Sequence, residues 1–303
     1  SKNINERVNL LKQCFKIIFN SNWSKKRFLE GMKNDYINSD KLVVINQSAK
    51  KNNNKIKKKN IITFVGKLNR SKGYDLFGKA IIKILNKYKN WKSIVIGDEP
   101  REKHFFEHKN LKVYGYKDHK FILKKLEKTS ISIICSRWNE PLGRASLEAC
   151  SRGSVPIITN KGGLPETSNS AVVINKLNVN NLTKKIENLI KNKDLLYNLQ
   201  IKNYKNFHFT PVFITQKIEK IRKSLLPVRS FNTINKNTKI KILHITNFNE
   251  RHNGRLHYNT GRRINNGFIR NNHTVFTLSD RDTIHNSKTL RDITGKNTFN
   301  KKI

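Results

Sequence analysis

Acidic residues are scarce in this sequence. The 303 residues include 21 Asp and Glu against 62 Lys and Arg, which gives a formal net charge of +41. Such a charge can indicate a polyanionic partner, either nucleic acid or an anionic membrane surface. Lys, Asn and Ile are abundant throughout, however, and no single stripe carries the charge, so we favour a general compositional bias. A chain this basic should still bind acidic surfaces in a salt-sensitive manner.

Cysteine and long hydrophobic runs are also scarce. Cys14, Cys135 and Cys150 lack metal-type spacing, so we expect buried, reduced side chains rather than metal ligands, nucleophiles or a disulfide. Runs such as residues 131–135 are far too short to span a membrane. The polar start shows no signal peptide and opens at Ser1 without methionine. We therefore expect a missing beginning and a cytoplasmic protein, with peripheral attachment to the inner face of the membrane left open.

Residues 131–166 carry the most informative pattern, ISIICSRWNEPLGRASLEACSRGSVPIITNKGGLPE. It predicts a short apolar strand, a loop, a helix beginning near Gly143, a second strand and a Gly-Gly loop ending at Glu166. The first backbone N–H groups of a helix have no partners and favour an anion. Glu140 and Glu148 flank this loop-to-helix junction, and carboxylates bind hydroxyl groups. A nucleotide-sugar offers a phosphate with sugar hydroxyls on both sides.

The wider chain alternates short strands with amphipathic helices, such as those over residues 75–88 and 121–128, which predicts an α/β fold with a Rossmann-like, doubly wound parallel sheet. Ligands bind beyond the carboxyl ends of the strands in such sheets. The loops at residues 66–73, 97–98, 136–143 and 160–166 each follow a strand directly, so we expect them to converge on one crevice. The predicted strands are residues 61–66, 93–97, 111–114, 131–135, 155–159 and 171–174.

The segment from Glu140 to Ala149 resembles the Glu-x7-Glu segment of retaining GT-B glycosyltransferases of family four. The resemblance extends upstream to GKLNRSKGYD and downstream to GGLPE. It implies that Glu148 holds the nucleotide ribose and that Glu140 reaches the donor sugar. It also implies that the loop of Gly66, Lys67 and Lys72 holds the diphosphate, with Lys72 and Glu140 on the catalytic side.

The resemblance further implies that the backbone of Leu142 and Gly143 approaches the donor and that Gly163 belongs to the last donor loop. Lys67 stands where the family usually has arginine, and lysine cannot make the same bidentate fork. Arg144 is open to two interpretations, a phosphate contact or a solvent-exposed side chain. Without the resemblance, the lysines would be interpreted as solvated side chains and the glutamates as ordinary residues of a helix start. We expect no metal and no cofactor beyond the nucleoside-diphosphate sugar as donor substrate.

The order of segments suggests a tandem arrangement. Residues 1–49 resemble the end of an amino-terminal GT-B domain and its crossover, with a helix capped by Ser21 or Asn22. Residues 50–226 are the predicted donor-binding domain, whose lysine-rich start at residues 50–60 we expect to be solvated. Residues 227–239 are a predicted linker, and residues 240–303 resemble the incomplete beginning of a second GT-B-like domain. His252 and His257 in that second unit are expected to be surface histidines.

These features predict a glycosyltransferase that moves a sugar from a nucleoside diphosphate to a saccharide or lipid-linked acceptor with retention, as in polysaccharide biosynthesis. This chain would supply the donor-binding half and would be inactive alone, because the crevice lies between two domains. Two alternatives stay open. One is a non-catalytic module that binds nucleotide-sugars. The other is a basic nucleic-acid-binding protein, although no recognition helix or aromatic platform is apparent and we expect no specific nucleic acid.

Overall fold

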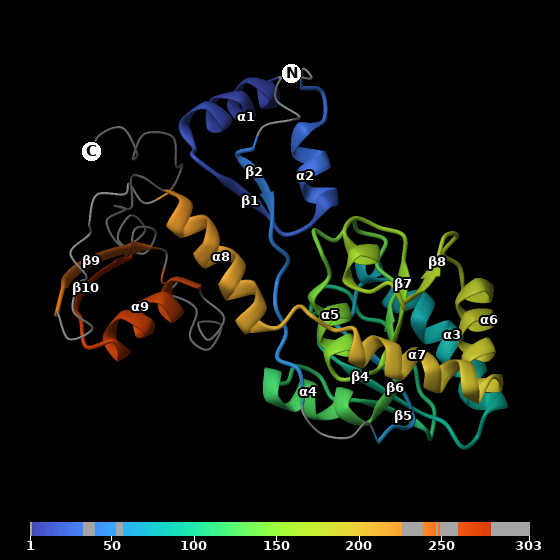
Figure 1. Cartoon of the computed structure of the whole chain (residues 1–303). Helices are drawn as coiled ribbons and strands as arrows, with labels where there is room; N and C mark the ends of the chain where they lie inside the picture. Colours follow the sequence, from blue (N-terminus) through green and yellow to red (C-terminus); the bar gives the residue numbers. More distant parts are fainter. Residues whose placement is uncertain are drawn as a thin grey trace, which may run out of the picture. The chain divides into compact units, whose positions relative to one another are not determined.

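The computed structural model describes residues 2–32, 40–52, 57–225, 239–246, 248 and 260–279. Contacts within the chain divide it into two compact units, Ser1–Leu226 and Pro227–Ile303, and each is described by itself (Figure 1). The predicted α/β class with a parallel central sheet is confirmed.

The first unit is built around a six-stranded sheet in which every neighbouring pair of strands is parallel. The strand order is β5-β4-β3-β6-β7-β8. The chain therefore runs outward from β3 to β5 and then returns to place β6 beside β3. That reversal is the topological switch point at which doubly wound sheets bind ligands. The strands are β3 (Lys59–Val65), β4 (Lys92–Ile96), β5 (Leu111–Val113), β6 (Thr129–Ile134), β7 (Val155–Thr159) and β8 (Val172–Ile174).

Helices cover both faces of this sheet. The crossover through α3 runs from β3 to β4, and the crossover through α5 runs the opposite way, from β6 to β7. Because such crossovers are right-handed, α3 and α5 lie on opposite faces, and the packing agrees, since α3 contacts α6 whereas α5 contacts α4 and α7. The helices are α3 (Tyr74–Lys87), α4 (His119–Lys128), α5 (Arg144–Ser151), α6 (Val179–Lys191), α7 (Lys193–Lys205) and α8 (Pro211–Leu225).

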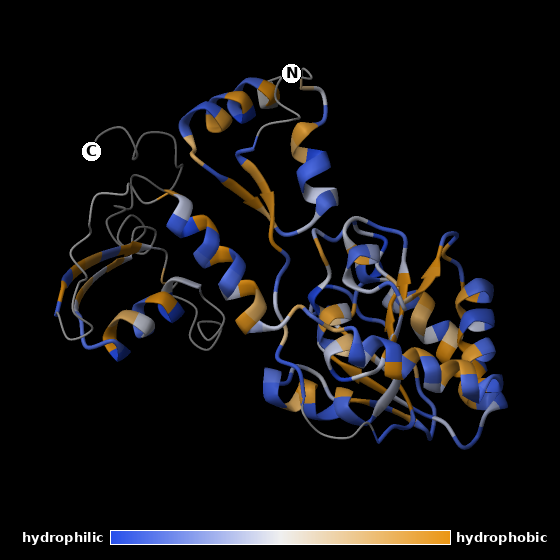
Figure 2. Ribbon diagram, in the orientation of Figure 1, coloured by the Kyte–Doolittle hydropathy of each residue, from blue (hydrophilic) through white to orange (hydrophobic). Residues whose placement is uncertain are grey.

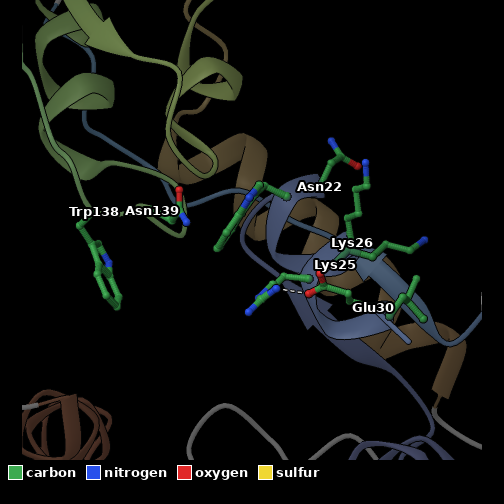
Figure 3. Close-up of a pocket in the computed structure, with 9 residues that line it drawn as sticks. Asn22, Lys25, Lys26, Glu30, Trp138 and Asn139 are labelled. Atoms are coloured by element: carbon green, nitrogen blue, oxygen red, sulfur yellow. Dashed lines mark hydrogen bonds and ion pairs between the residues drawn. The ribbon is translucent and has the colours of Figure 1, made fainter. Parts of the chain in front are cut away.

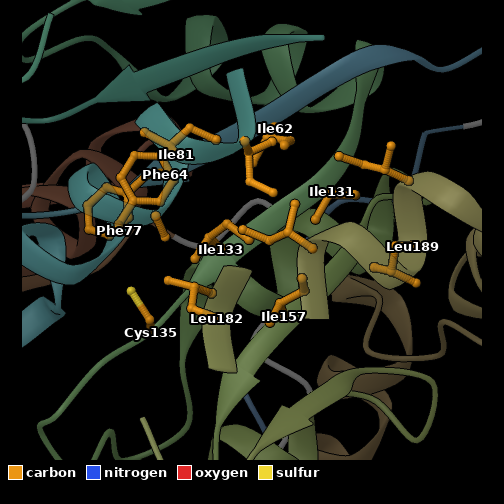
Figure 4. Packing of buried hydrophobic residues seen from close by; sticks show 14 of the residues in the cluster. Ile62, Phe64, Phe77, Ile81, Ile131, Ile133, Cys135, Ile157, Leu182 and Leu189 are labelled. Atoms are coloured by element: carbon orange, nitrogen blue, oxygen red, sulfur yellow. The ribbon is translucent and has the colours of Figure 1, made fainter. Parts of the chain in front are cut away.

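The main hydrophobic core lies between the sheet and the pair α3 and α6 (Figure 4). Phe77, Ile81 and Ile84 recur at helical spacing on α3 and are completely buried, as expected for a helix with one apolar face. The apolar strands and polar outer surfaces are visible in Figure 2. Truncating one such residue to alanine typically costs about 2–5 kcal/mol of stability.

The amino-terminal segment contributes α1 (Lys2–Gln13), β1 (Ile17–Phe19), α2 (Asn22–Leu29) and β2 (Leu42–Val44), with β1 and β2 parallel. Ser21 is the N-cap of α2, and its hydroxyl accepts a hydrogen bond from the Ser24 N–H at 3.0 Å. A second hydrophobic cluster joins this segment to α5 and α8. Its buried members are Ile45, Ala49, Leu142, Leu147, Cys150, Phe207, Phe209 and Ile214.

The prediction of a fully solvated stretch at residues 50–60 is wrong at its end. Lys58 is half-buried, and its ammonium donates to the carbonyl oxygens of Leu126, Glu127 and Arg152 at 3.0, 3.1 and 2.6 Å. These carbonyls belong to the carboxyl ends of α4 and α5, where unpaired carbonyls and the helix dipole attract a cation. Burial nevertheless lowers the pKa of Lys58 to about 7. Strand β3 then begins directly, at Lys59.

The second unit contains β9 (Lys241–Thr246), α9 (Thr260–Arg270) and β10 (Thr274–Ser279). The two strands pair in parallel from Lys241 opposite Thr274 to Thr246 opposite Ser279. The order of strand, helix and strand agrees with the elements that the sequence predicted for this unit. His252 and His257 lie outside the described residues.

Candidate functional site

A cavity of about 240 Å³ opens at the switch point of the sheet. It lies beyond the carboxyl ends of the adjacent strands β3 and β6 and beside the start of α5. Four of the predicted site residues, Gly66, Lys72, Glu140 and Gly143, line it together. Lys67, Leu142, Glu148 and Gly163 are not among its lining residues, and their positions are described below.

Lys72 and Glu140 form an ion pair across this cavity, from the Lys72 ammonium to Oε1 of Glu140. Lys72 ends the 3₁₀ turn Arg70–Lys72, whose N-cap Asn69 accepts the Lys72 N–H at 3.0 Å. Glu140 follows β6 on the neighbouring loop. Their side chains are 32% and 14% exposed, so both charges are partly shielded from water. The pair places a cation and a carboxylate on the wall of one cavity.

The start of α5 supplies further anion-binding groups. Gly143 is the N-cap with φ of 107°, a left-handed conformation that favours glycine. An added Cβ there would also lie 2.3 Å from Cδ2 of Leu164. Within the described chain, the N–H groups of Arg144 and Ala145 have no hydrogen-bond partner, and both residues line the cavity. The helix start and Lys72 therefore surround one space suited to a phosphate group.

Glu148 lies one turn further along α5 and is held by the side chains of His119 and Arg144. Its Oε1 accepts from Nε2 of His119 at 2.9 Å and from Nε of Arg144 at 3.1 Å. The Glu148 side chain is only 8% exposed, whereas those of His119 and Arg144 are 43% and 55% exposed. No described residue donates to the second oxygen, Oε2. Glu148 is thus oriented through one oxygen while the other remains able to accept a hydroxyl hydrogen bond.

The contact between His119 and Glu148 was not predicted from the sequence. The two residues are 29 positions apart and meet only because α4 packs beside α5. One signal was available, since His119 is the first residue of α4, directly after the N-cap Asp118, in the passage that follows β5. Arg144, whose role was open, is solvent-exposed, at 55% of its side chain, and also pairs with Glu148.

Other predicted donor residues lie further from the cavity. Lys67 is exposed. The Leu142 side chain is 1% exposed and belongs to the second hydrophobic cluster, so only its backbone could face a ligand. Gly163 donates its N–H to the carbonyl of Glu140 at 2.7 Å. This hydrogen bond joins the Gly163 loop to the backbone of Glu140.

Glu166 makes contacts that the sequence did not indicate. Its carboxylate accepts from the backbone N–H of Asn22 at 2.7 Å and of Trp23 at 2.8 Å, and from the Asn22 side chain at 3.0 Å. Beside it, the Ser21 hydroxyl donates to the Pro141 carbonyl. Glu166 therefore caps α2 and is not among the residues that line the cavity.

Cys135 and Cys150 are fully buried, and burial raises the pKa of each thiol to about 12. Such thiols are poor nucleophiles at neutral pH. Among the described residues, no three His, Cys, Asp or Glu side chains are grouped in a way that could hold a metal ion. The described helices also include none with the length and apolar character needed to cross a membrane.

The sequence profile of the family described as "Glycosyl transferases group 1" matches residues 46–206. Among curated proteins, YtcC of Bacillus subtilis (strain 168), a provisionally named glycosyltransferase, is 28% identical over 121 residues, which are 36% of this chain. The chain spans about 30% of the length of that relative.

Among solved structures, the Anabaena protein Alr3699/HepE in complex with UDP and glucose is similar, with a TM-score of 0.61 and 17% identity over 74% of this chain and 67% of that one. A glycosyltransferase from Rickettsia africae is similar with a TM-score of 0.57 and 21% identity, covering 69% of this chain and 63% of that one. At such identities the similarity concerns the fold.

Proposed function

Because the chain belongs to the glycosyl transferases group 1 family, we propose that it provides the donor-binding part of a retaining, family-four-like glycosyltransferase. Residues 50–226 would form the donor-binding domain. The observation that supports this most directly is the Lys72–Glu140 pair facing the start of α5 in one cavity at the switch point. A similar fold holds UDP and glucose in the Anabaena protein, which supports a nucleotide-sugar as the donor.

In this proposal the diphosphate lies between the Lys72 ammonium and the first N–H groups of α5. Glu140 accepts hydrogen bonds from hydroxyls of the donor sugar. The free oxygen of Glu148 accepts from the ribose, in line with its orientation by His119 and Arg144. The two carboxylates thus bind hydroxyls on either side of the phosphate site.

The reaction transfers one glycosyl group. An acceptor hydroxyl oxygen forms a bond to the anomeric carbon, and the bond from that carbon to the diphosphate oxygen breaks. The electron pair leaves with the diphosphate, which also takes the hydroxyl proton. Lys72 and the α5 N–H groups stabilise the negative charge that develops on the leaving group, and fixed charges of this kind commonly give the largest catalytic contribution. The acceptor in this proposal is a saccharide or a lipid-linked glycan.

Calorimetry with UDP-, GDP- and ADP-glucose tests the proposal. One nucleotide-sugar should bind the wild-type chain, and Glu148→Ala should weaken it. Loss of a hydrogen bond to a charged group costs about 1.5–3 kcal/mol, so affinity should fall roughly ten- to a hundredfold. An unchanged affinity would remove Glu148 from the site, and absence of binding by all three sugars would refute the donor role.

A further inference from the structure

A second and larger hollow, of about 1,100 Å³, lies beside the candidate donor site (Figure 3). One wall is the face of α2 that carries Asn22, Lys25, Lys26 and Glu30, and the other is the loop of Trp138 and Asn139 that leads to Glu140. Its lining residues include none of those that line the smaller cavity. The volume is slightly above the range of about 300–1,000 Å³ for small-molecule sites, so an extended ligand fits it better than a single sugar.

Trp138 is an aromatic residue that lines this hollow and whose backbone is held by hydrogen bonds. Its backbone N–H donates to Ser71 O at 3.3 Å and to the Ser136 hydroxyl at 3.1 Å, and its carbonyl accepts from that hydroxyl at 3.1 Å. The guanidinium group of the preceding residue, Arg137, donates to the two carboxylate oxygens of Asp75 at 2.6 and 2.8 Å. The indole is nonetheless 62% exposed. A large apolar ring held in solvent by an ordered loop provides a preformed surface for a flat partner.

The opposite wall is cationic. Lys25, Lys26 and Arg27 line the hollow with Glu30 as the one acid among its lining residues, and Glu30 is paired with Arg27. Lys25 donates to the Leu42 carbonyl at 3.2 Å. In the described part of the chain, Lys26 is exposed and has no hydrogen-bond or ion-pair partner. An anionic ligand would therefore be favoured here over a neutral one.

We propose that this hollow binds an anionic saccharide, which serves as the acceptor of the glycosyl group. Trp138 stacks against the apolar face of a sugar ring, and Lys26 pairs with an acidic group on the same saccharide. Trp138 lies two residues before Glu140 on one loop, so a saccharide on its ring lies next to the candidate donor site. The inference rests on the proposed function for its role as acceptor, but the binding site itself is tested separately.

The test uses the 303-residue chain saturated with UDP and titrated calorimetrically with trigalacturonic acid, maltotriose or inorganic pyrophosphate. Trigalacturonic acid should bind about tenfold more tightly than maltotriose. Trp138→Ala should weaken the acidic trisaccharide about tenfold, which corresponds to roughly 1.4 kcal/mol, and Trp138→Phe should restore most of the loss. Lys26→Gln should remove the preference for the acidic trisaccharide.

Matched controls separate this site from the general basicity of the protein. Phe105→Ala removes another aromatic ring, which is 81% exposed and lines neither cavity, and Lys79→Gln removes an exposed lysine of α3. Both variants should bind trigalacturonic acid as the wild type does. If Lys79→Gln weakened binding as much as Lys26→Gln, attraction to the overall charge would explain the result and the inference would fail.

Other outcomes also overturn it. An unchanged affinity for the trisaccharide in Trp138→Ala would exclude the Trp138 ring from the binding site. Complete displacement of trigalacturonic acid by pyrophosphate would show that the lysines bind only a phosphate. Weaker UDP binding in Trp138→Ala would assign the ring to the donor base. If the chain binds UDP-glucose but does not bind trigalacturonic acid, this inference is refuted and the donor function is not. If the chain binds trigalacturonic acid in a Trp138-dependent manner but does not bind UDP-glucose, the saccharide site is supported and the donor function is refuted.

Discussion

The carboxylate of Glu166 accepts a hydrogen bond of 2.8 Å from the backbone N–H of Trp23, a residue 143 positions earlier in the chain. Its other oxygen accepts from the N–H of Asn22. The same loop supports Glu140 on its other side, because Gly163 donates to the Glu140 carbonyl at 2.7 Å and Gly162 forms a β-bridge with Glu140. One short loop therefore links the start of α2 to the backbone of a candidate catalytic residue.

Glu166→Gln should weaken the attachment of the start of α2 to this loop without abolishing donor binding. Glutamine retains one acceptor oxygen, so one of the two backbone bonds is lost together with the charge that favours a helix start. We expect faster amide exchange at Asn22 and Trp23 and a loss of about 0.5–2 kcal/mol in the free energy of unfolding. Hydrogen exchange and urea denaturation measure these effects.

Asp118→Ala is the matched control, because Asp118 caps α4 by accepting the Phe121 N–H at 2.7 Å. It should cost similar stability while leaving exchange in α2 unchanged. If Glu166→Gln left exchange at Asn22 and Trp23 unchanged, the carboxylate would not hold this helix in solution.

Lys58 should make stability depend on pH. Its pKa is lowered to about 7 by burial against 10.5 in the unfolded chain, so between these values the unfolded chain binds more protons. The free energy of unfolding should then rise with pH across this window, and it should fall again as the pH is lowered from about 10.5 to about 7. The slope from one such group is at most about 1.4 kcal/mol per pH unit.

Urea denaturation of wild type and Lys58→Met between pH 7 and 9.5 measures this difference. The variant should show a flatter profile, whereas Lys57→Met at the exposed neighbouring lysine should follow the wild type. Equal slopes in wild type and Lys58→Met would mean that the three carbonyls keep Lys58 charged throughout.

The strands were predictable because each is a short apolar run bounded by polar or glycine residues. All six observed strands of the sheet begin and end within two residues of the predicted ones, as for β7 at Val155–Thr159. The grouping of Gly66, Lys72, Glu140 and Gly143 was also predictable, because each follows or caps an element on one edge of a parallel sheet.

The partners of these residues were not predictable. His119 reaches Glu148 only through the packing of α4 on α5, and Glu166 reaches α2 across much of the chain. Lys58 was misjudged because a lysine-rich segment normally indicates solvent, whereas two helix ends converge on this particular ammonium. Periodicity describes which face of an element is apolar, but it contains no information on which polar groups meet across elements.

His119 should act as a positioning residue for Glu148. Its ring holds Oε1 at 2.9 Å, so His119→Ala should lower affinity for the nucleotide-sugar by a smaller factor than Glu148→Ala, about three- to tenfold. The double variant should bind no more weakly than Glu148→Ala alone, because residues in one hydrogen-bond network are not additive. Calorimetry of the three variants checks this, and fully additive losses would contradict the positioning role.

Lys72 should contribute more to diphosphate binding than Lys67, although the two lysines lie on the same loop. Lys72 lines the cavity and is only 32% exposed, whereas Lys67 is exposed and lines no described cavity. Lys72→Gln removes a cation and also leaves Glu140 unpaired near the bound phosphates, so both changes weaken diphosphate binding. We expect UDP affinity to fall about ten- to a hundredfold, against less than threefold for Lys67→Gln.

Because partly shielded charges are screened less than exposed ones, the loss in Lys72→Gln should persist at high salt. Equal losses in the two variants, or losses that vanish in salt, would show that the loop acts only through its general positive charge.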